Sequence, residues 1–298
     1  MAAYRELLAH RFVRLTSAVT TFPGEERDLA ERAIEDGTEV LVAVGGDGTW
    51  SAVADRIVAS GRKDLALGIL PAGTGNDFGR SLGMDARDPR EAVEILARGA
   101  VRDVDVGIVS TPSASEHAPR RVEPRHFINV VGFGFDIAVI DAAAGARFLR
   151  GELLYKVTAL QQLFRFPGLD ASLTSEGGVH RHERHLMLTV SNGSFFGGGF
   201  PIAPDAAADD GLLHACRIAD AGPLTRLRLF NLAEKGRHPE SDRVEILSDR
   251  SFRLDFPSPP RFEVDGDVRQ AHDTSVELRV LPAALRVVAP RYSVAQST

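Results

Sequence analysis

The first hundred residues alternate between helical and strand-like patterns of apolar side chains. Amphipathic stretches with apolar residues at helical spacing predict helices, and short continuous apolar runs predict buried strands. The predicted helices are 25–35, 50–59 and 88–98, and the predicted strands are 39–44 and 65–70. This alternation indicates an α/β fold with a parallel sheet and right-handed crossovers, in which binding sites lie at the carboxyl ends of the strands.

The rest of the chain is richer in short alternating segments, which are typical of antiparallel strands. Two helical stretches, 135–146 and 151–165, follow a polar, proline-containing loop at 110–125. Strands are then predicted at 169–175, 184–191, 211–218, 243–247, 251–256, 260–264 and 275–281, with a last strand at 284–289. We therefore expect an α/β domain at 1–106 and a β-rich domain at 107–282.

Two glycine-rich segments stand where the first two strands should end. One is Gly45-Gly46-Asp47-Gly48-Thr49, and the other runs from Leu70 to Phe78 as Leu-Pro-Ala-Gly-Thr-Gly-Asn-Asp-Phe. Backbone N–H groups and a helix dipole at such a position can hold a phosphate, and glycine lets the backbone approach it. A tight turn without a ligand is the alternative, but GGDGT arises by chance in only about one chain in several thousand. The candidate phosphate contacts are Gly45, Gly46, Gly48, Thr49, Gly73, Thr74, Gly75, Asn76 and Asp77.

Carboxylates beside glycines mark further positions where chemistry could take place. Asp47 and Asp77 repel a phosphate, so they suit a bridging Mg²⁺ or a ribose hydroxyl better. Asp265-Gly266 and Asp210-Gly211 are also strong turn signals, so plain turns remain the alternative at both places. A capping role is equally open for Asp105.

These motifs carry a resemblance to a known family. GGDGT followed by the Leu70–Phe78 segment resembles the catalytic domain of the diacylglycerol kinase family, and more narrowly its soluble bacterial lipid kinases. The agreement covers roughly residues 25 to 290, in the right order. It continues through Phe127-Ile128-Asn129, Gly132-Phe133-Gly134-Phe135-Asp136, Ser191-Asn192-Gly193, Gly197-Gly198-Gly199, Ala203-Pro204-Asp205-Ala206, Asp209-Asp210-Gly211 and Val264-Asp265-Gly266-Asp267.

The resemblance implies a fold like that of NAD kinase and diacylglycerol kinase, with a cleft between the two domains and residues 283–298 returning to the first. It implies ATP and Mg²⁺ as cofactors and a lipid as substrate. Asp265 is then the general base on the lipid hydroxyl, and Asp47, Asp77 and Asp105 orient Mg²⁺, water and nucleotide. Asp210 matches a structural metal loop. Asp267 stands where the family more often carries Glu and is a candidate metal residue. If it positions the metal through water, the shorter side chain is tolerated, and if it contacts a ligand directly, activity or substrate preference differs.

One departure concerns the start of the chain. Family members usually open with a strand that ends in Asn-Pro and a glycine-containing turn, whereas this chain begins Met1-Ala2-Ala3-Tyr4 and has its first glycine at Gly24. Residues 4–10 resemble the end of the helix that should follow that turn. We expect either that upstream codons in frame encode the missing strand or that the ATP site lacks one edge.

Composition limits the classes of protein that fit. Of the 298 residues, 44% are hydrophobic and 26% are charged, which is the balance of a soluble protein with a sizeable core. The formal charge of −6 argues against a nucleic-acid binder, and the single cysteine excludes an internal disulfide. No signal peptide or membrane span is expected, so we predict a cytoplasmic protein that contacts the inner face of the membrane transiently and that could form a homodimer.

The helix at 152–166 has apolar side chains at helical spacing, and basic residues flank it. Core packing with a solvated basic edge is the favoured interpretation, and a wall of an acyl-chain cleft or a membrane contact is the alternative. The apolar positions are Leu153, Val157, Leu160 and Phe164, and the basic ones are Arg147, Arg150, Lys156 and Arg165.

Three functions are compatible with these observations. The first is an ATP-dependent lipid kinase that phosphorylates a hydroxyl of diacylglycerol or a similar lipid. The second is a kinase of a soluble substrate such as NAD, because GGDGT-type loops recur in those enzymes. The third is a non-catalytic protein that binds a nucleotide or a lipid.

Overall fold

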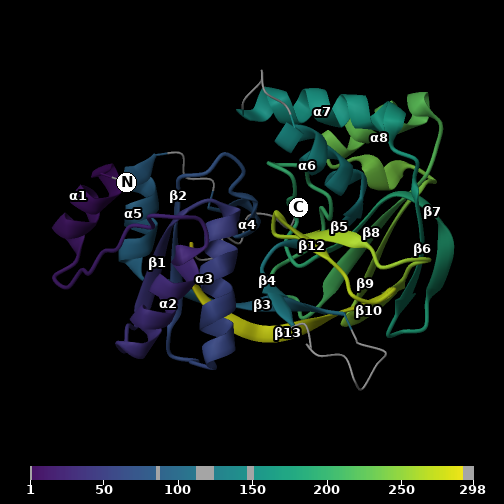
Figure 1. Ribbon diagram of the computed structural model, residues 1–298. Helices are drawn as coiled ribbons and strands as arrows, with labels where there is room; N and C mark the ends of the chain where they lie inside the picture. Colours follow the sequence, from purple (N-terminus) through teal and green to yellow (C-terminus); the bar gives the residue numbers. More distant parts are fainter. Residues whose placement is uncertain (1, 85–87, 112–123, 146–150, 291–298) are drawn as a thin grey trace.

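The computed structural model describes residues 2–84, 88–111, 124–145 and 151–290, with the side chains of 143–157 left out (Figure 1). Most of the predicted loop at 110–125, together with Arg147, Arg150 and the end of the predicted return at 291–298, lies outside these residues. None of the helices in the described part of the chain combines the length and the apolar character needed to cross a membrane.

The first domain is an α/β layer, drawn in purple and blue in Figure 1. Strands β1 and β2 pair in parallel from Val40–Ala66 to Gly45–Pro71. Both glycine-rich segments follow directly, so the predicted parallel arrangement is confirmed. The elements are α1 (Ala2–Arg11), α2 (Glu25–Glu35), β1 (Val40–Gly45), α3 (Asp47–Ser60), β2 (Ala66–Pro71), α4 (Asp77–Ser81) and α5 (Pro89–Arg98).

Local sequence explains where these helices begin and end. The side chain of Asp88 accepts a hydrogen bond from the N–H of Arg90, and Pro89 occupies the first turn, so α5 begins there. Gly61 takes a left-handed conformation and ends α3. Trp50 is fully buried within α3 and donates its indole N–H to the carbonyl of Ala43 at 3.1 Å, which fixes the helix on β1.

The second domain is mainly antiparallel, and its helices α6, α7 and α8 lie together on one side of its strands (Figure 1). The sequence pattern did not predict α8, because its apolar residues are spread around the helix: Leu224 is exposed and Leu229 is buried. The elements are β3 (Val101–Ser110), β4 (Arg125–Phe127), β5 (Val130–Gly134), α6 (Phe135–Gly145), α7 (Gly151–Arg165), β6 (Leu169–Ser175), β7 (His180–Ser191), β8 (Leu213–Ala219), α8 (Pro223–Glu234), η1 (His238–Glu240), β9 (Val244–Asp249), β10 (Ser251–Asp255), β11 (Arg261–Val264), β12 (Asp267–Gln270) and β13 (Ser275–Val288).

Strand β13 joins the two domains. Its first part pairs antiparallel with β10, and its last residues, Arg286–Val288, pair in parallel with β2. The two strands predicted at 275–281 and 284–289 are therefore one strand with an irregularity between Leu281 and Leu285. Ala283 takes a positive φ of 48° within that irregularity, which marks it as a bulge.

Candidate functional site

The two glycine-rich segments pack against each other. A Cβ atom on Gly73 would stand only 2.7 Å from the Cα of Gly46, and a Cβ on Gly46 would stand 3.2 Å from the Cα of Gly73. The N–H of Ala72 also donates to the carbonyl of Gly45 at 2.8 Å. The backbones thus pass with no room for a side chain, and together they form one loop pair at the carboxyl ends of β1 and β2.

The remaining predicted contacts lie in or around this loop pair. Asn76 has a φ of 55°, donates to the carbonyl of Gly73 at 3.0 Å and has a buried Oδ1 without a partner. A Cβ on Gly45 would overlap the side chain of Thr49. Thr74 is exposed, and Gly48 has open space where a side chain would be.

Gly73→Ala should separate the two segments and weaken ATP binding by at least about tenfold, since backbone atoms cannot yield to the new methyl group. Gly222→Ala is the matched control, because Gly222 has a negative φ and open space around it. Calorimetric titration of ATP into both variants gives the two affinities. Wild-type ATP affinity in a folded Gly73→Ala protein would show that the contact is unimportant for the nucleotide.

Asp47 and Asp77 flank Gly75. A Cβ on Gly75 would stand 3.0 Å from Asp47 Oδ2 and 3.7 Å from Asp77 Oδ2. Asp47 accepts from the N–H of Phe78 at 3.0 Å, and Asp77 accepts from that of Gly198 at 2.8 Å. Burial, and to a smaller extent the charge of Asp47, raise the pKa of Asp77 to about 6.

The oxygen ligands at this position are suitable for Mg²⁺. Asp77 Oδ1 is buried without a hydrogen-bond partner, which is energetically unfavourable, and a bound cation would supply the missing partner. Within the described residues, no three His, Cys, Asp or Glu side chains converge closely enough to hold a metal ion by themselves. A magnesium ion here would therefore need phosphate oxygens or water as further ligands, which is its usual manner of binding.

Asp265 lies in a buried turn and is fully engaged by hydrogen bonds. Its carboxylate accepts from the backbone N–H groups of Ile128 at 2.9 Å, Asn129 at 3.0 Å and Val130 at 2.9 Å, and from the hydroxyl of Ser51. Burial raises its pKa to about 6, against the effect of these bonds. The geometry gives Asp265 an anchoring position between α3 and β5.

Asp267 differs from Asp265 in its surroundings. Its side chain is 56% exposed and faces Arg27 of α2, Arg125 of β4 and Arg269 of β12. One face of α3 carries Asp47, Ser51 and Asp55, which are four residues apart. Asp47 belongs to the loop pair, Ser51 bonds Asp265, and Asp55 binds Arg27, which faces Asp267.

Asp105 and Asp210 lie at another loop. Asp105 accepts from the N–H groups of Gly211 at 2.6 Å and Ala283 at 2.8 Å, and burial raises its pKa. Asp210 accepts from Leu212 N–H at 2.9 Å and contacts His214 Nε2 at 2.9 Å. The sequence interpretation grouped Asp105 with Asp47 and Asp77, whereas its carboxylate holds the 207–211 loop and the bulge of β13. A metal role for Asp105, Asp210 and Asp267 stays a prediction.

The second domain contains an apolar cavity beside α7, the helix for which the wall of an acyl-chain cleft was the alternative interpretation of the sequence. Its volume is about 70 Å³, and it lies between helices α6, α7 and α8 and strands β7 and β8. Among the described residues of the lining, Asp136 is the one that is charged, and both of its carboxylate oxygens are buried without a hydrogen bond of good geometry. The lining also includes Phe135, Val139, Ala159, Leu163, Leu186, Met187, Phe196, Gly197, Phe200, Ile202, Ile218, Leu229, Phe230 and Ala233.

Asp136 forms a buried pair with Glu263. Burial raises the pKa of Asp136 to about 7, and burial together with the charge of Asp136 raises the pKa of Glu263 well above its usual value. Glu263 Oε1 has no partner, while Oε2 accepts from the N–H of Gly266 at 2.5 Å. The polar end of the cavity is therefore connected to the 265–267 turn. At its rim, Gly197 adjoins Gly198, whose N–H binds Asp77.

The prediction that the apolar stripe of α7 forms core is wrong for two of its positions. Leu160 and Phe164 are 45% and 54% exposed, whereas Ala159 and Leu163 are buried and line the cavity. The side chains of Leu153 and Val157 lie outside the described residues. The Gly132–Asp136 motif was the available signal for the cavity, because Asp136 ends it at the start of α6.

Comparisons with known proteins agree with this arrangement. Residues 129–289 match the family model of the YegS C-terminal NAD kinase beta sandwich-like domain, and residues 1–109 match that of the diacylglycerol kinase catalytic domain. A diacylglycerol kinase from Mycobacterium tuberculosis is 30% identical over 285 residues, which cover 96% of this chain and 88% of that protein.

Two solved structures have the same fold. A diacylglycerol kinase from Bacillus anthracis superposes with a TM-score of 0.70 at 18% identity, covering 95% of this chain and 88% of that one. Yeast NADH kinase in complex with NADH superposes with a TM-score of 0.51 at 14% identity, covering 88% and 64%. The predicted fold class and the predicted resemblance are both confirmed. The chain belongs to the diacylglycerol kinase family.

Proposed function

We propose that the protein transfers the γ-phosphoryl group of ATP to a hydroxyl of diacylglycerol or of a similar lipid. The observation that carries this proposal is the apolar cavity that ends at the buried pair of Asp136 and Glu263. A hydrocarbon chain suits its lining, and a neutral polar group of the same molecule can pair with the unpartnered carboxyl oxygens. Glu263 accepts a hydrogen bond from the N–H of Gly266, so a polar group that pairs with Glu263 lies close to the 265–267 turn.

The loop pair supports ATP as the phosphoryl donor. Its backbone lies at the start of α3, where N–H groups and the helix dipole favour phosphate oxygens. Asp47 and Asp77 would hold Mg²⁺ together with the phosphates. When bound, the metal ion supplies charge neutralisation for phosphoryl transfer.

Asp267 is the better candidate than Asp265 for the general base. A base must reach the acceptor hydroxyl, and Asp267 is the exposed carboxylate of the turn. The oxygens of Asp265 already accept from three backbone N–H groups and one hydroxyl, so its role in the proposal is to hold the turn against β5 and α3.

A soluble dinucleotide as the acceptor is less compatible with the cavity. Its charged phosphates and ribose hydroxyls need polar partners, and Asp136 is the one charged residue among the described residues of the lining. The likeness to yeast NADH kinase, at 14% identity, concerns the fold alone. A non-catalytic protein would not need the two carboxylates, Asp47 and Asp77, that flank Gly75 in the loop pair.

Ala159→Phe tests the proposal by filling the cavity from α7. We expect KM for diacylglycerol in mixed micelles to rise about tenfold or more, with KM for ATP unchanged, because the ring occupies the space of the acceptor chain. Ala97→Phe on the exposed face of α5 is the matched control. Ala233→Phe, from α8, replaces the first variant if a melting curve shows that it unfolds. Unchanged acceptor kinetics in both folded cavity variants would contradict the proposal.

A further inference from the structure

Three arginines converge on a single oxygen between the domains. The Nη2 atoms of Arg27, Arg125 and Arg269 stand 3.8, 3.9 and 3.7 Å from Oδ2 of Asp267. These distances exceed the 2.7–2.9 Å that is usual for a charge-assisted hydrogen bond, by about 1 Å. The three guanidinium groups therefore surround Asp267 loosely and keep hydrogen-bonding capacity toward a closer partner.

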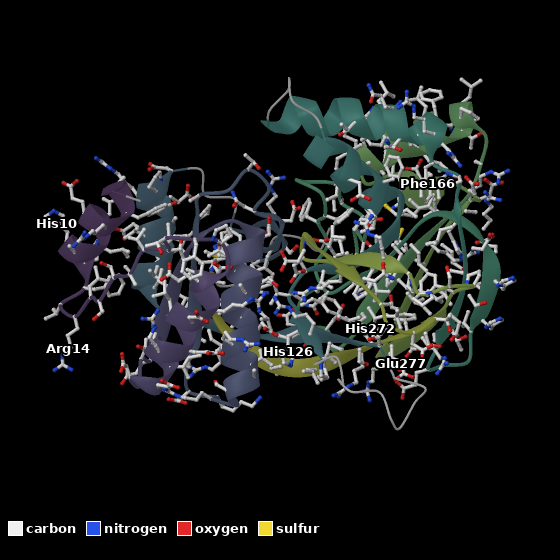
Figure 2. The ribbon with its side chains drawn as sticks, in the orientation of Figure 1. His10, Arg14, His126, Phe166, His272 and Glu277 are labelled. Atoms are coloured by element: carbon white, nitrogen blue, oxygen red, sulfur yellow. The ribbon has the colours of Figure 1, made fainter. Side chains whose placement is uncertain are left out.

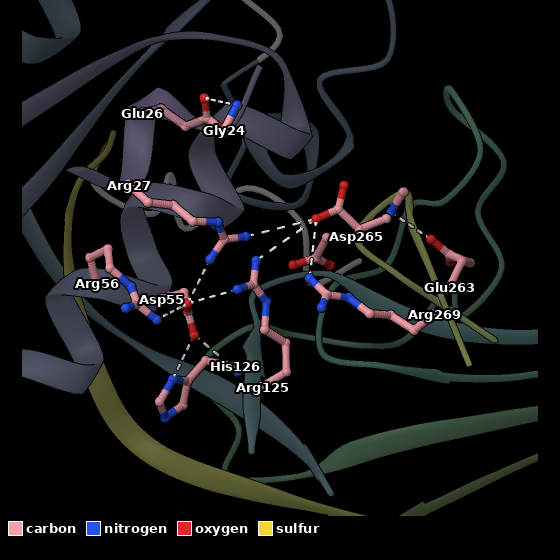
Figure 3. A network of polar contacts seen from close by, with 12 residues as sticks. Gly24, Glu26, Arg27, Asp55, Arg56, Arg125, His126, Glu263, Asp265 and Arg269 are labelled. Atoms are coloured by element: carbon pink, nitrogen blue, oxygen red, sulfur yellow. Dashed lines mark hydrogen bonds and ion pairs between the residues drawn. The ribbon is translucent and has the colours of Figure 1, made fainter. Parts of the chain in front are cut away.

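Asp55 holds Arg27 and Arg125 on the side away from Asp267 (Figure 3). Its buried Oδ2 accepts from Nη1 of Arg27 and from Nη1 of Arg125, each at 2.9 Å. Each guanidinium group thus uses one nitrogen for Asp55 and presents the other to Asp267, so the pair is pre-organised.

The charge of Asp55 is secured by its other partners. His126 contacts its Oδ1 at 3.0 Å and lies where α3 meets β4 (Figure 2). Burial alone would raise the pKa of Asp55, but hydrogen bonds from His126 and Arg56 outweigh it and lower the pKa to about 2. Asp55 is therefore ionised at neutral pH and keeps both arginines in place.

The cluster is rich in guanidinium groups and has an open side. Arg27, Arg56 and Arg125 share the one buried carboxylate of Asp55, and Arg56 also pairs with Glu31 at 2.9 Å. Arg269 is 44% exposed and Asp267 is 56% exposed, so a ligand can reach them from solvent. Three convergent guanidinium groups whose Nη2 atoms stand 3.7 to 3.9 Å from a carboxylate oxygen match the oxygens of a phosphate monoester better than one carboxylate does.

We propose that Arg27, Arg125 and Arg269 form a binding site for a phosphate monoester dianion, separate from the loop pair that receives ATP. The proposal rests on the proposed function where it names the ligand as the phosphorylated product. When Asp267 accepts the proton of the acceptor hydroxyl, it loses its negative charge as the product phosphate forms beside it. The arginines then bind the phosphate dianion in place of the neutral carboxyl group of Asp267. Asp55 acts as the positioning residue, because it holds Arg27 and Arg125.

The alternative is that these arginines only tie the domains together through surface ion pairs, which contribute little. The two interpretations predict opposite effects of removing the Asp267 charge on phosphate affinity. If the arginines bind phosphate, Asp267 competes with it, and Asp267→Asn should tighten phosphate binding about fivefold by removing a like charge. If they only tie the domains together, the loss of Asp267 cannot improve phosphate binding.

Calorimetric titration of the purified protein, without ATP or acceptor, tests the proposal independently of any activity. The probes are inorganic phosphate, phosphatidylcholine vesicles that contain phosphatidate, and vesicles of phosphatidylcholine alone. Arg269→Gln should weaken binding of the phosphate monoester about tenfold. Arg269 is 44% exposed and, among the described residues, pairs with Asp267 alone, so the variant should fold. Arg228→Gln on the exposed face of α8 is the matched control.

The probes also separate the two sources of the phosphate. Arg269-dependent binding of phosphatidate vesicles that exceeds binding of inorganic phosphate would assign the site to the product lipid, and equal binding would assign it to soluble phosphate. Either result supports the site. Phosphate binding that is absent in the wild type, unchanged in Arg269→Gln or weakened in Asp267→Asn would overturn the proposal, even if the enzyme phosphorylates lipids as proposed.

Discussion

Asp267→Asn should lower kcat by about 10²–10⁴ at saturating ATP and acceptor, because it removes the carboxylate proposed as the general base for the acceptor hydroxyl. The fold should be unaffected, since the side chain is 56% exposed and its ion pairs with the three arginines are loose. KM for ATP should change little. Initial rates of lipid phosphorylation, with a melting curve for each protein, give these values, and Asp242→Asn on an exposed loop is the matched control.

Asp265→Asn should behave differently. An amide at this position would direct its NH₂ group toward backbone N–H donors, and the loss should be about 1–3 kcal/mol of unfolding free energy. If the folded Asp265→Asn protein lost its turnover while Asp267→Asn kept most of it, the base would be Asp265, as the sequence interpretation had it.

Asp136→Asn should stabilise the protein at alkaline pH and impair its use of the acceptor. Asp136 has a pKa of about 7 in the folded protein, above its ordinary value of 3.8. The folded state therefore holds its proton more tightly than the unfolded chain does. The stability from this group is complete below about pH 4 and falls as the pH rises toward about 7.

The neutral amide removes the part of the pH dependence that Asp136 contributes, while the buried Glu263 keeps its own part. Urea unfolding at about pH 8 should show the variant to be more stable than the wild type by on the order of 3 kcal/mol, and at about pH 4 the difference should nearly vanish. KM for the lipid should rise, because the amide replaces a carboxyl group at the polar end of the cavity. A variant that is less stable at about pH 8 would show that the carboxyl group has a partner that stabilises its charge.

Elements with a strong local pattern could be predicted from the sequence. Helix α2 has the predicted bounds, and the glycine segments follow β1 and β2 because a strand-to-helix turn of this kind depends on local backbone conformation. The contact of Gly46 with Gly73 could not be read from the sequence, because it depends on the pairing of two strands.

The roles of the carboxylates depend on tertiary contacts. Asp265 and Asp267 are two residues apart and share one turn, yet one is buried among N–H donors from β5 and the other faces three arginines. An acyl-chain cleft was only the less favoured interpretation of the 152–166 helix, because a cavity lining of Leu, Phe and Ile is chemically the same as core. Asp55 escaped prediction for another reason, since its partners Arg27 and Arg125 come from α2 and β4, far from it in sequence.

The fate of the γ-phosphoryl group in a competition between two acceptors tests the central claim most directly. The purified protein is given ATP labelled in that group, Mg²⁺, and diacylglycerol and NAD together, and the label is then counted in the lipid and in the dinucleotide. We predict that the label accumulates in the lipid and that Asp267→Asn abolishes most of this transfer. Label in the dinucleotide, or in neither acceptor, would contradict the assignment of this protein as a lipid kinase.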